Sequence, residues 1–128
     1  MALFILFVAQ LFSRRAPFHD LADITFLFSF SRGESVAHFF INLPSKKLYG
    51  EYFRVIKQPI SLNLIKKRIA LGEYPTWAEF ESAVQLIRTN AEEYNDERSS
   101  IVEDARKLDV RTQFHIRASI EADTFSAH

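Results

Sequence analysis

The sequence contains no cysteine and only three glycines among its 128 residues. Without cysteine the chain forms no disulfide framework, no thiol nucleophile and no zinc–thiolate site. So few glycines argue against a glycine-rich phosphate-binding loop. An excess of one charge is also missing, because 16 basic residues balance 16 acidic ones. This balance argues against bulk electrostatic binding of nucleic acid or anionic lipid, so we expect a pocket to recognise any partner.

Length and composition predict one folded domain. A chain of 128 residues can bury one substantial hydrophobic core but not two. The hydrophobic fraction of 48% and the charged fraction of 25% are typical of globular proteins and exclude wholesale disorder. Since neither a strand-like alternation nor an internal repeat is visible, the fold class is expected to be all-α.

Residues that could bind a metal or catalyse a reaction are not grouped. The four histidines are far apart, and none lies three or four residues from another. The carboxylates of residues 92–97 are expected on a solvated helix end, and the basic run of residues 66–68 on an exposed helix face. We therefore expect no catalytic residue, metal or cofactor, no direct binding of nucleic acid, and no enzyme activity.

The head of the chain is unusually apolar. Residues 1–40 hold nine of the 13 phenylalanines, and residues 1–12 contain one polar side chain, Gln10. As a helix, twelve residues span about 18 Å and fall short of the ~20 residues that cross a bilayer. Three interpretations of residues 1–19 stay open: an extension of the first helix or an apolar tail, a wrongly chosen start, and a membrane or targeting signal. No membrane partner is expected.

Apolar periodicity predicts a first helix over residues 20–30, with Gly33 suited to a left-handed cap behind it. Residues 36–60 have no sustained period and many aromatic side chains, which is typical of a long functional loop. A second helix is expected after the N-cap candidate Ser61 and before Gly72.

The third helix has the clearest signal, because apolar residues repeat three and four apart over residues 77–94, behind a Thr76–Glu79 capping box. A second capping box, Ser100–Glu103, predicts a fourth helix that ends near residue 116, with residues 117–128 expected to fray. Short connections favour antiparallel neighbours and hence an up-and-down bundle over residues 20–116.

Tyr94 and Asn95 lie where the third helix is expected to end. An asparagine there is ordinarily a helix cap. Here it lies opposite a long aromatic loop, and Ile101 follows six residues later. An asparagine amide, a tyrosine hydroxyl and apolar walls at the open end of a bundle suit a small neutral amide as ligand.

Several spaced segments resemble a bromodomain, most closely the polybromo and remodeller-ATPase type. Residues 43–61 and 65–74 are similar to its long loop and second helix, Asn90-Ala91 and Tyr94-Asn95 to its asparagine signature, and residues 99–108 to the start of its last helix. The similarity covers roughly residues 20–110. It implies a left-handed up-and-down four-helix bundle with a long loop between helices 1 and 2, which recognises acetyl-lysine.

The resemblance also implies roles for individual residues. Asn95 is similar to the asparagine whose amide donates to the acetyl carbonyl, and Tyr52 to the tyrosine that reaches this carbonyl through a water. Phe40 matches the phenylalanine at the methyl end of the pocket. Other implied pocket residues are Ile101 at the gatekeeper position, Tyr94, Leu43 and Tyr49.

The sequence departs from the family pattern at several pocket positions. Gly50 stands where proline is common, Phe53 replaces the second tyrosine, and His38-Phe39 replaces a Trp–Pro pair. The resemblance still implies a nuclear reader of acetylated histone tails, working with other subunits or domains of a chromatin-remodelling or transcription-regulating assembly. The alternative is a degenerate helical scaffold that contacts proteins without recognising acetyl-lysine.

Overall fold

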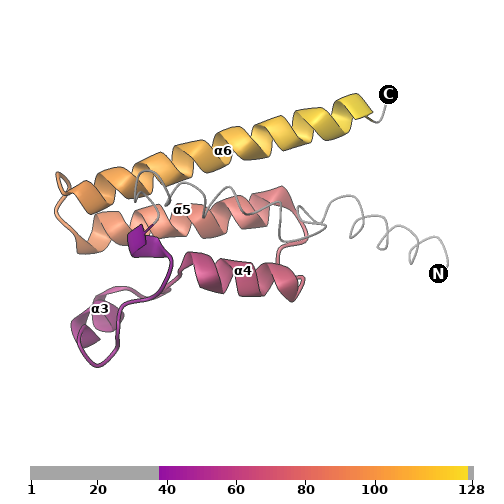
Figure 1. Cartoon of the computed structure of the whole chain (residues 1–128). Coiled ribbons are helices and arrows are strands. Elements are labelled where there is room, and N and C mark those ends of the chain that lie inside the picture. The colour runs from indigo at the N-terminus through magenta and orange to yellow at the C-terminus, as the bar shows by residue number, and fades with distance from the viewer. Residues whose placement is uncertain (1–37, 127–128) are drawn as a thin grey trace.

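The computed structural model describes residues 38–126, so the segment 1–19 and the helix expected over residues 20–30 lie outside the described part. All regular elements of the described part are helical, which confirms the all-α class (Figure 1). They are the 3₁₀-helix η2 (His38–Phe40) and the α-helices α3 (Gly50–Val55), α4 (Leu62–Ala70), α5 (Trp77–Tyr94) and α6 (Ser100–Ser126).

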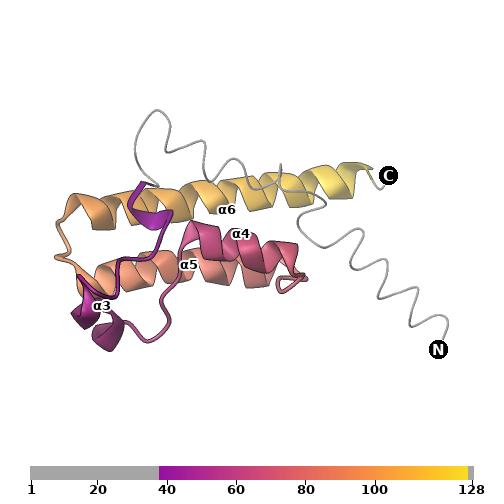
Figure 2. The ribbon, with the colours of Figure 1, turned by 60° about the horizontal axis from the view of Figure 1, so that its bottom comes forward.

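Helices α5 and α6 lie antiparallel and side by side, and α4 packs along α5 (Figures 1 and 2). The apolar stripes predicted for these helices face one another and form the core. Fully buried side chains come from all three helices and from the end of the loop: Ile56, Leu62, Ile65, Phe80, Val84, Val102 and Leu108. No helix of the described residues is long and apolar enough to cross a bilayer.

Local signals set the starts of α4 and α5 as predicted. The hydroxyl of Ser61 accepts a hydrogen bond from the backbone N–H of Leu64 at 3.1 Å. Thr76 and Glu79 form the reciprocal capping box, since each side chain accepts from the backbone N–H of the other residue. Gly72, which follows α4, has a φ of 74°, a left-handed conformation that glycine adopts without a steric cost.

Helix α6 differs from the prediction at both ends. The predicted Ser100–Glu103 capping box requires Ser100 to be the N-cap. The helix instead begins at Ser100, so Ser100 is its first helical residue. It continues to Ser126, ten residues beyond the end predicted near residue 116. The fraying expected for residues 117–128 stays a prediction. The apolar period is lost after the buried Ile116 because residues 117–121 are not buried. The residues that follow include no proline or glycine that would end the helix.

The long loop is more ordered than its lack of periodicity indicates. It contains η2 and the six-residue α3, which lies at the end of the bundle where α5 passes into α6 (Figure 1). Asn63, at the start of α4, fixes the loop after η2: its backbone N–H donates to the Ile41 carbonyl at 3.1 Å and its amide Nδ2 to Asn42 Oδ1 at 2.7 Å.

Charged side chains cross-link α5 and α6. Arg88 Nε lies 3.2 Å from Oδ2 of the buried Asp109, and Arg106 Nη2 lies 3.0 Å from Glu92 Oε2. Gln113 donates a further hydrogen bond to Asp109 Oδ1 at 3.1 Å. A buried carboxylate without such partners is strongly destabilising, so these contacts fix how α5 and α6 pair.

Candidate ligand-binding pocket

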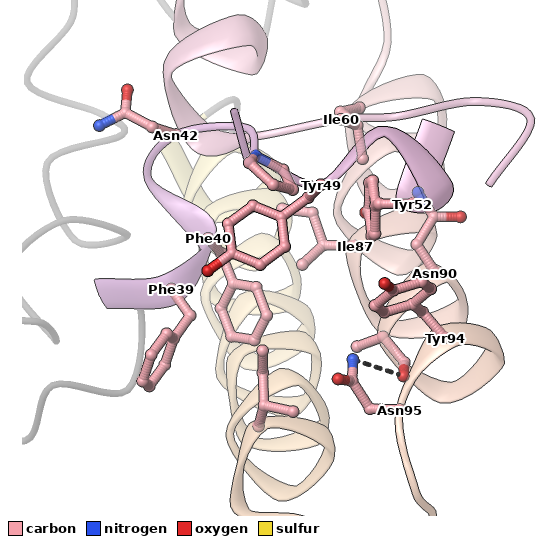
Figure 3. Close-up of a pocket in the computed structure, with 13 residues that line it drawn as sticks. Phe39, Phe40, Asn42, Tyr49, Tyr52, Ile60, Ile87, Asn90, Tyr94 and Asn95 are labelled. Carbon is pink, nitrogen blue, oxygen red and sulfur yellow. Dashed lines mark hydrogen bonds between the residues drawn. The ribbon is translucent and has the colours of Figure 1, made fainter. Parts of the chain in front are cut away.

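A cavity of about 370 Å³ opens between the loop and the end of α5 (Figure 3). This volume lies within the range of small-ligand sites. The side chains around it come from η2 and the loop after it, from α3 and the segment between α3 and α4, from α5 with its C-cap residue Asn95, and from the first turn of α6. They are Phe39, Phe40, Asn42, Pro44, Tyr49, Tyr52, Ile60, Ile87, Asn90, Ala91, Tyr94, Asn95 and Ile101.

Six of the seven predicted pocket residues line this cavity: Phe40, Tyr49, Tyr52, Tyr94, Asn95 and Ile101. The seventh, Leu43, does not, and its side chain is 37% exposed. Neighbouring residues of this non-helical segment face different directions, and Pro44 contributes to the cavity wall in place of Leu43. Leu43 therefore does not border the cavity in this structure, and its contact with a ligand stays a prediction.

Asn95 ends α5 with its amide held in a defined position. Its backbone N–H and its side-chain Nδ2 both donate to the Ala91 carbonyl, at 3.0 Å and 3.1 Å (Figure 3). Its φ of −110° and ψ of 161° are extended, so it closes the helix without the left-handed conformation. Because an amide nitrogen carries two hydrogens, one donor and the amide oxygen stay available at the cavity.

Tyr52 and Tyr94 lie beside each other on the same side of the cavity as Asn95 (Figure 3). Their ring centroids are 4.9 Å apart at an interplanar angle of 72°, the edge-to-face geometry that aromatic rings prefer. Burial, chiefly, together with the nearby Tyr94 and Glu93, raises the pKa of Tyr52 above its usual value. The Tyr52 hydroxyl is therefore neutral at physiological pH and is both a donor and an acceptor.

Apolar side chains form the inner wall. Phe40, Ile60 and Ile87 are buried core residues that also face the cavity. Ile101 is partly buried, packs against the same core and borders the cavity from α6. An aliphatic group fits such a wall, whereas an ammonium ion would lose its hydration there without a compensating charge.

Asn90 has a structural role that the sequence did not indicate. Its side chain is 6% exposed, and Nδ2 donates to the Gln58 carbonyl, 32 residues earlier, at 2.9 Å. This bond fixes the segment before α4 against α5. Ile87, Asn90 and Tyr94 lie on one face of α5, because they are three and four residues apart. This helical spacing could have predicted that Asn90 lines the cavity.

Among residues 38–126, no group of three or more histidine, cysteine or acidic side chains is placed to hold a metal ion. The polar atoms at the cavity belong instead to amides and phenols. This donor set suits hydrogen bonding to a neutral ligand. The absence of metal and cofactor stays a prediction.

Comparisons with known proteins agree on one family for this chain. The statistical model of the Bromodomain family matches residues 25–107. The chain is 39% identical over 77 residues to chromatin structure-remodeling complex subunit rsc4 of Schizosaccharomyces pombe, covering 60% of this chain and 14% of rsc4. It is 36% identical over 94 residues to subunit snf21 from the same yeast, covering 73% of this chain and 8% of snf21. The chain thus spans a small part of these relatives.

The fold has a counterpart among solved structures. The bromodomain of human BAZ1A superposes with a TM-score of 0.66 at 25% identity, over 80% of this chain and 95% of the other. The match confirms the predicted bromodomain-like four-helix bundle. It also confirms the resemblance found in the sequence motifs.

Proposed function

Since this chain belongs to the bromodomain family, we propose that its cavity binds acetylated lysine in histone tails. The observation that carries this proposal is the Asn95 amide, held by the Ala91 carbonyl and directed to a cavity with apolar walls. One Nδ2 hydrogen donates to the acetyl oxygen. Tyr52, whose hydroxyl is neutral, reaches the same oxygen through a bridging water, and Phe40 contacts the acetyl methyl group.

Selectivity in this proposal comes from the difference between an amide and an ammonium ion. Acetylation removes the positive charge of lysine and adds one carbonyl acceptor, which the Asn95 amide satisfies. Free lysine would bring an ammonium ion against Phe40 and Ile87 without a carboxylate among the cavity-lining residues. The pocket therefore discriminates mainly by excluding the charged form.

The relatives support a chromatin setting for this reader. The relatives rsc4 and snf21 are named as subunits of a chromatin structure-remodeling complex, and another relative is named a nuclear protein. We infer that this chain acts in the nucleus, in a chromatin-remodelling or transcription-regulating assembly, as a binding module without catalytic activity. The competing function is a degenerate scaffold that contacts proteins but ignores acetylation.

Titration calorimetry with paired histone peptides tests the proposal. One peptide carries acetyl-lysine and the other carries lysine at the same position, and a panel of sites covers the histone tails. We expect saturable binding of at least one acetylated peptide and none of its unmodified partner. Equal binding of both forms would support the scaffold, and no binding across the panel would refute the reader.

The raised pKa of Tyr52 predicts binding that is insensitive to pH. A tyrosine hydroxyl stays protonated below its ordinary pKa of 10.0, and the raised pKa of Tyr52 extends this pH range upward. The Kd for an acetylated peptide without titrating side chains is therefore expected to stay within about twofold from pH 6 to 9, as measured by fluorescence anisotropy. A marked loss of affinity below pH 9 would show that the tyrosine ionises and that its environment is wrongly described.

Truncation of Ile101 is expected to weaken the same complex moderately. Ile101→Ala removes apolar contact at the cavity border, which corresponds to about 1 kcal/mol or roughly a fivefold rise in Kd. Ile101→Val, which removes one methyl group, is the matched control and should lie between parent and alanine. If Ile101→Ala unfolds the domain in a thermal melt, the side chain is a core residue and not a pocket border.

A further inference from the structure

The outward face of helix α6 carries two large apolar side chains that are exposed. Val110 is 51% exposed and Phe114 is 66% exposed. They lie about one turn apart, because Phe114 follows Val110 by four residues. The buried residues of α6 lie on its other side and are Val102, Ala105, Leu108, Asp109, Thr112 and Ile116. Val110 and Phe114 therefore lie outside the core and form a small exposed apolar patch.

Helix α6 is the longest element of the described part of the chain. It has 27 residues against 18 in α5, and its C-terminal end extends past α4 and α5 in both views (Figures 1 and 2). In proteins, helices gain most of their stability by packing an apolar face against another element. A second helix that covers Val110 and Phe114 would supply such packing.

Charged side chains flank Phe114 symmetrically on the same face. Lys107 precedes Phe114 by seven residues, and Glu121 follows it by seven. Seven residues make about two helical turns, so the three exposed side chains lie nearly in one row. Lys107 lies 3.5 Å from Glu103, but these side chains are 49% and 70% exposed, so their ion pair is weak and can exchange partners.

From this row we infer that α6 is the interface of an antiparallel dimer of this chain. A two-fold axis beside Phe114 places the ring of each copy against the ring of the other. The same axis sets Lys107 of each copy opposite the partner's Glu121, so two ion pairs form. The row is thus complementary to itself, as a two-fold contact requires. A parallel pair would instead set each charge opposite its own counterpart.

The other exposed side chains of the row fit this pairing. Arg117 lies three residues after Phe114, and Val110 lies four residues before it. Antiparallel helices therefore bring Arg117 of one copy beside the partner's Val110. The aliphatic stem of an arginine can cover an apolar side chain while its guanidinium group stays hydrated.

The contact is small, so the inferred dimer is weak. One pair of helices with two apolar side chains from each copy buries less than the about 1,200 Å² of a typical stable interface. We expect a dissociation constant of about 10⁻⁵ to 10⁻³ M for the full chain. Sedimentation equilibrium over this concentration range measures it.

A dimer of this kind would be a bivalent reader, a consequence that rests on the proposed function. Ile101, which borders the cavity, lies thirteen residues before Phe114. At about 1.5 Å per residue, each Ile101 is about 20 Å from the two-fold axis along α6, in opposite directions. The two cavities therefore lie about 40 Å apart along the helices, and one dimer can bind two acetyl-lysines at once.

Two charge reversals test the pairing by sedimentation of the full chain at about 50 mM salt, where surface charges are weakly screened. Lys107→Glu places a like charge opposite the partner's Glu121 in both ion pairs, and Glu121→Lys does the same opposite Lys107. Each variant should dimerise at least about fivefold more weakly than the parent. A mixture of the two variants restores opposite charges in both pairs, so it should form a heterodimer with an affinity near that of the parent. A mixture that stays monomeric would overturn the antiparallel register.

A third variant and a control test the surface itself. Phe114→Ser removes the apolar centre of the contact and should weaken dimerisation at least about tenfold. Glu73→Lys changes the net charge as Glu121→Lys does, but at an exposed position outside α6, and should leave the dissociation constant within about twofold. A parent that stays monomeric at about 1 mM overturns the inference. Association that Phe114→Ser leaves intact also overturns it, because another surface, such as the apolar residues 1–12, would then hold the copies together.

A linked peptide tests the bivalent reader. Its two acetyl-lysines are joined by a flexible linker that can span about 40 Å. The parent should bind this peptide at least about tenfold more tightly than Phe114→Ser does, whereas a peptide with one acetyl-lysine should bind both proteins equally. Equal binding of the linked peptide would overturn the arrangement of the two cavities. If the single acetyl-lysine peptide does not bind the parent, the proposed function fails, while the sedimentation results still decide on the dimer.

Discussion

Replacing Asn95 by aspartate is expected to abolish binding of an acetylated histone peptide. The carboxylate has nearly the shape of the amide but only accepts hydrogen bonds, so it would face the acetyl oxygen with a second acceptor. The truncation Asn95→Ala removes the donor without adding charge. It should cost about 1–3 kcal/mol, which corresponds to roughly a 5- to 150-fold rise in Kd by calorimetry.

Stability should change much less than binding in these variants. Asn95 is partly buried at a helix end, and its Nδ2 donates to the Ala91 carbonyl, so aspartate loses one local hydrogen bond. We expect the melting temperature to fall by only about 3–6 °C. Asn95 would be a helix cap and nothing more if Asn95→Asp bound acetylated peptide as the parent does.

Asn42→Asp is the matched control for charge at this cavity. Asn42 also lines the cavity, but its Oδ1 accepts a hydrogen bond from Asn63, and an aspartate keeps that acceptor. It should leave the Kd for acetylated peptide within about threefold of the parent value. A loss comparable to that of Asn95→Asp would mean that any negative charge at the cavity repels the ligand and that Asn95 has no specific role.

Local signals made much of the fold predictable. The capping box at Thr76 and the N-cap at Ser61 act within three residues, so the sequence contains the full signal for the starts of α5 and α4. The end of α6 is different. Apolar periodicity reports which residues are buried. Helix α6 continues for ten residues beyond the buried Ile116, and none of residues 117–121, whose burial is described, is buried.

Pocket residues on helices were also more predictable than those on the loop. Tyr94 and Asn95 follow from the end of α5, and Ile101 from the start of α6. The position of Leu43 relative to the cavity was not predictable, because the direction of a side chain in a non-periodic segment depends on distant contacts, such as those of Asn63 with the loop. Since the loop and α4 meet only in the folded chain, motif similarity could not settle whether Leu43 or Pro44 faces the cavity.

The two asparagines of the signature should separate stability from recognition. Asn90 donates to the Gln58 carbonyl at 2.9 Å from a position that is 6% exposed. Asn90→Ala leaves that carbonyl without its donor and creates a void, so we expect a loss of about 1–3 kcal/mol and a fall in melting temperature of roughly 4–12 °C. Asn90→Asp should be worse, since it places an acceptor-only and charged group in the same buried position.

Binding of acetylated peptide, in contrast to stability, should depend more on Asn95 than on Asn90. Measured well below the melting temperature, Asn90→Ala should still bind acetylated peptide, because the Asn95 donor is intact. Asn95→Ala should bind the same peptide roughly 5- to 150-fold more weakly although its domain is stable. Thr89→Ala, at the exposed neighbouring position on α5, controls for side-chain truncation on this helix. If Asn90→Ala melts like the parent, the bond to Gln58 does not hold the loop against α5. The orientation of Tyr52, which this loop carries over the cavity, must then depend on its edge contact with Tyr94.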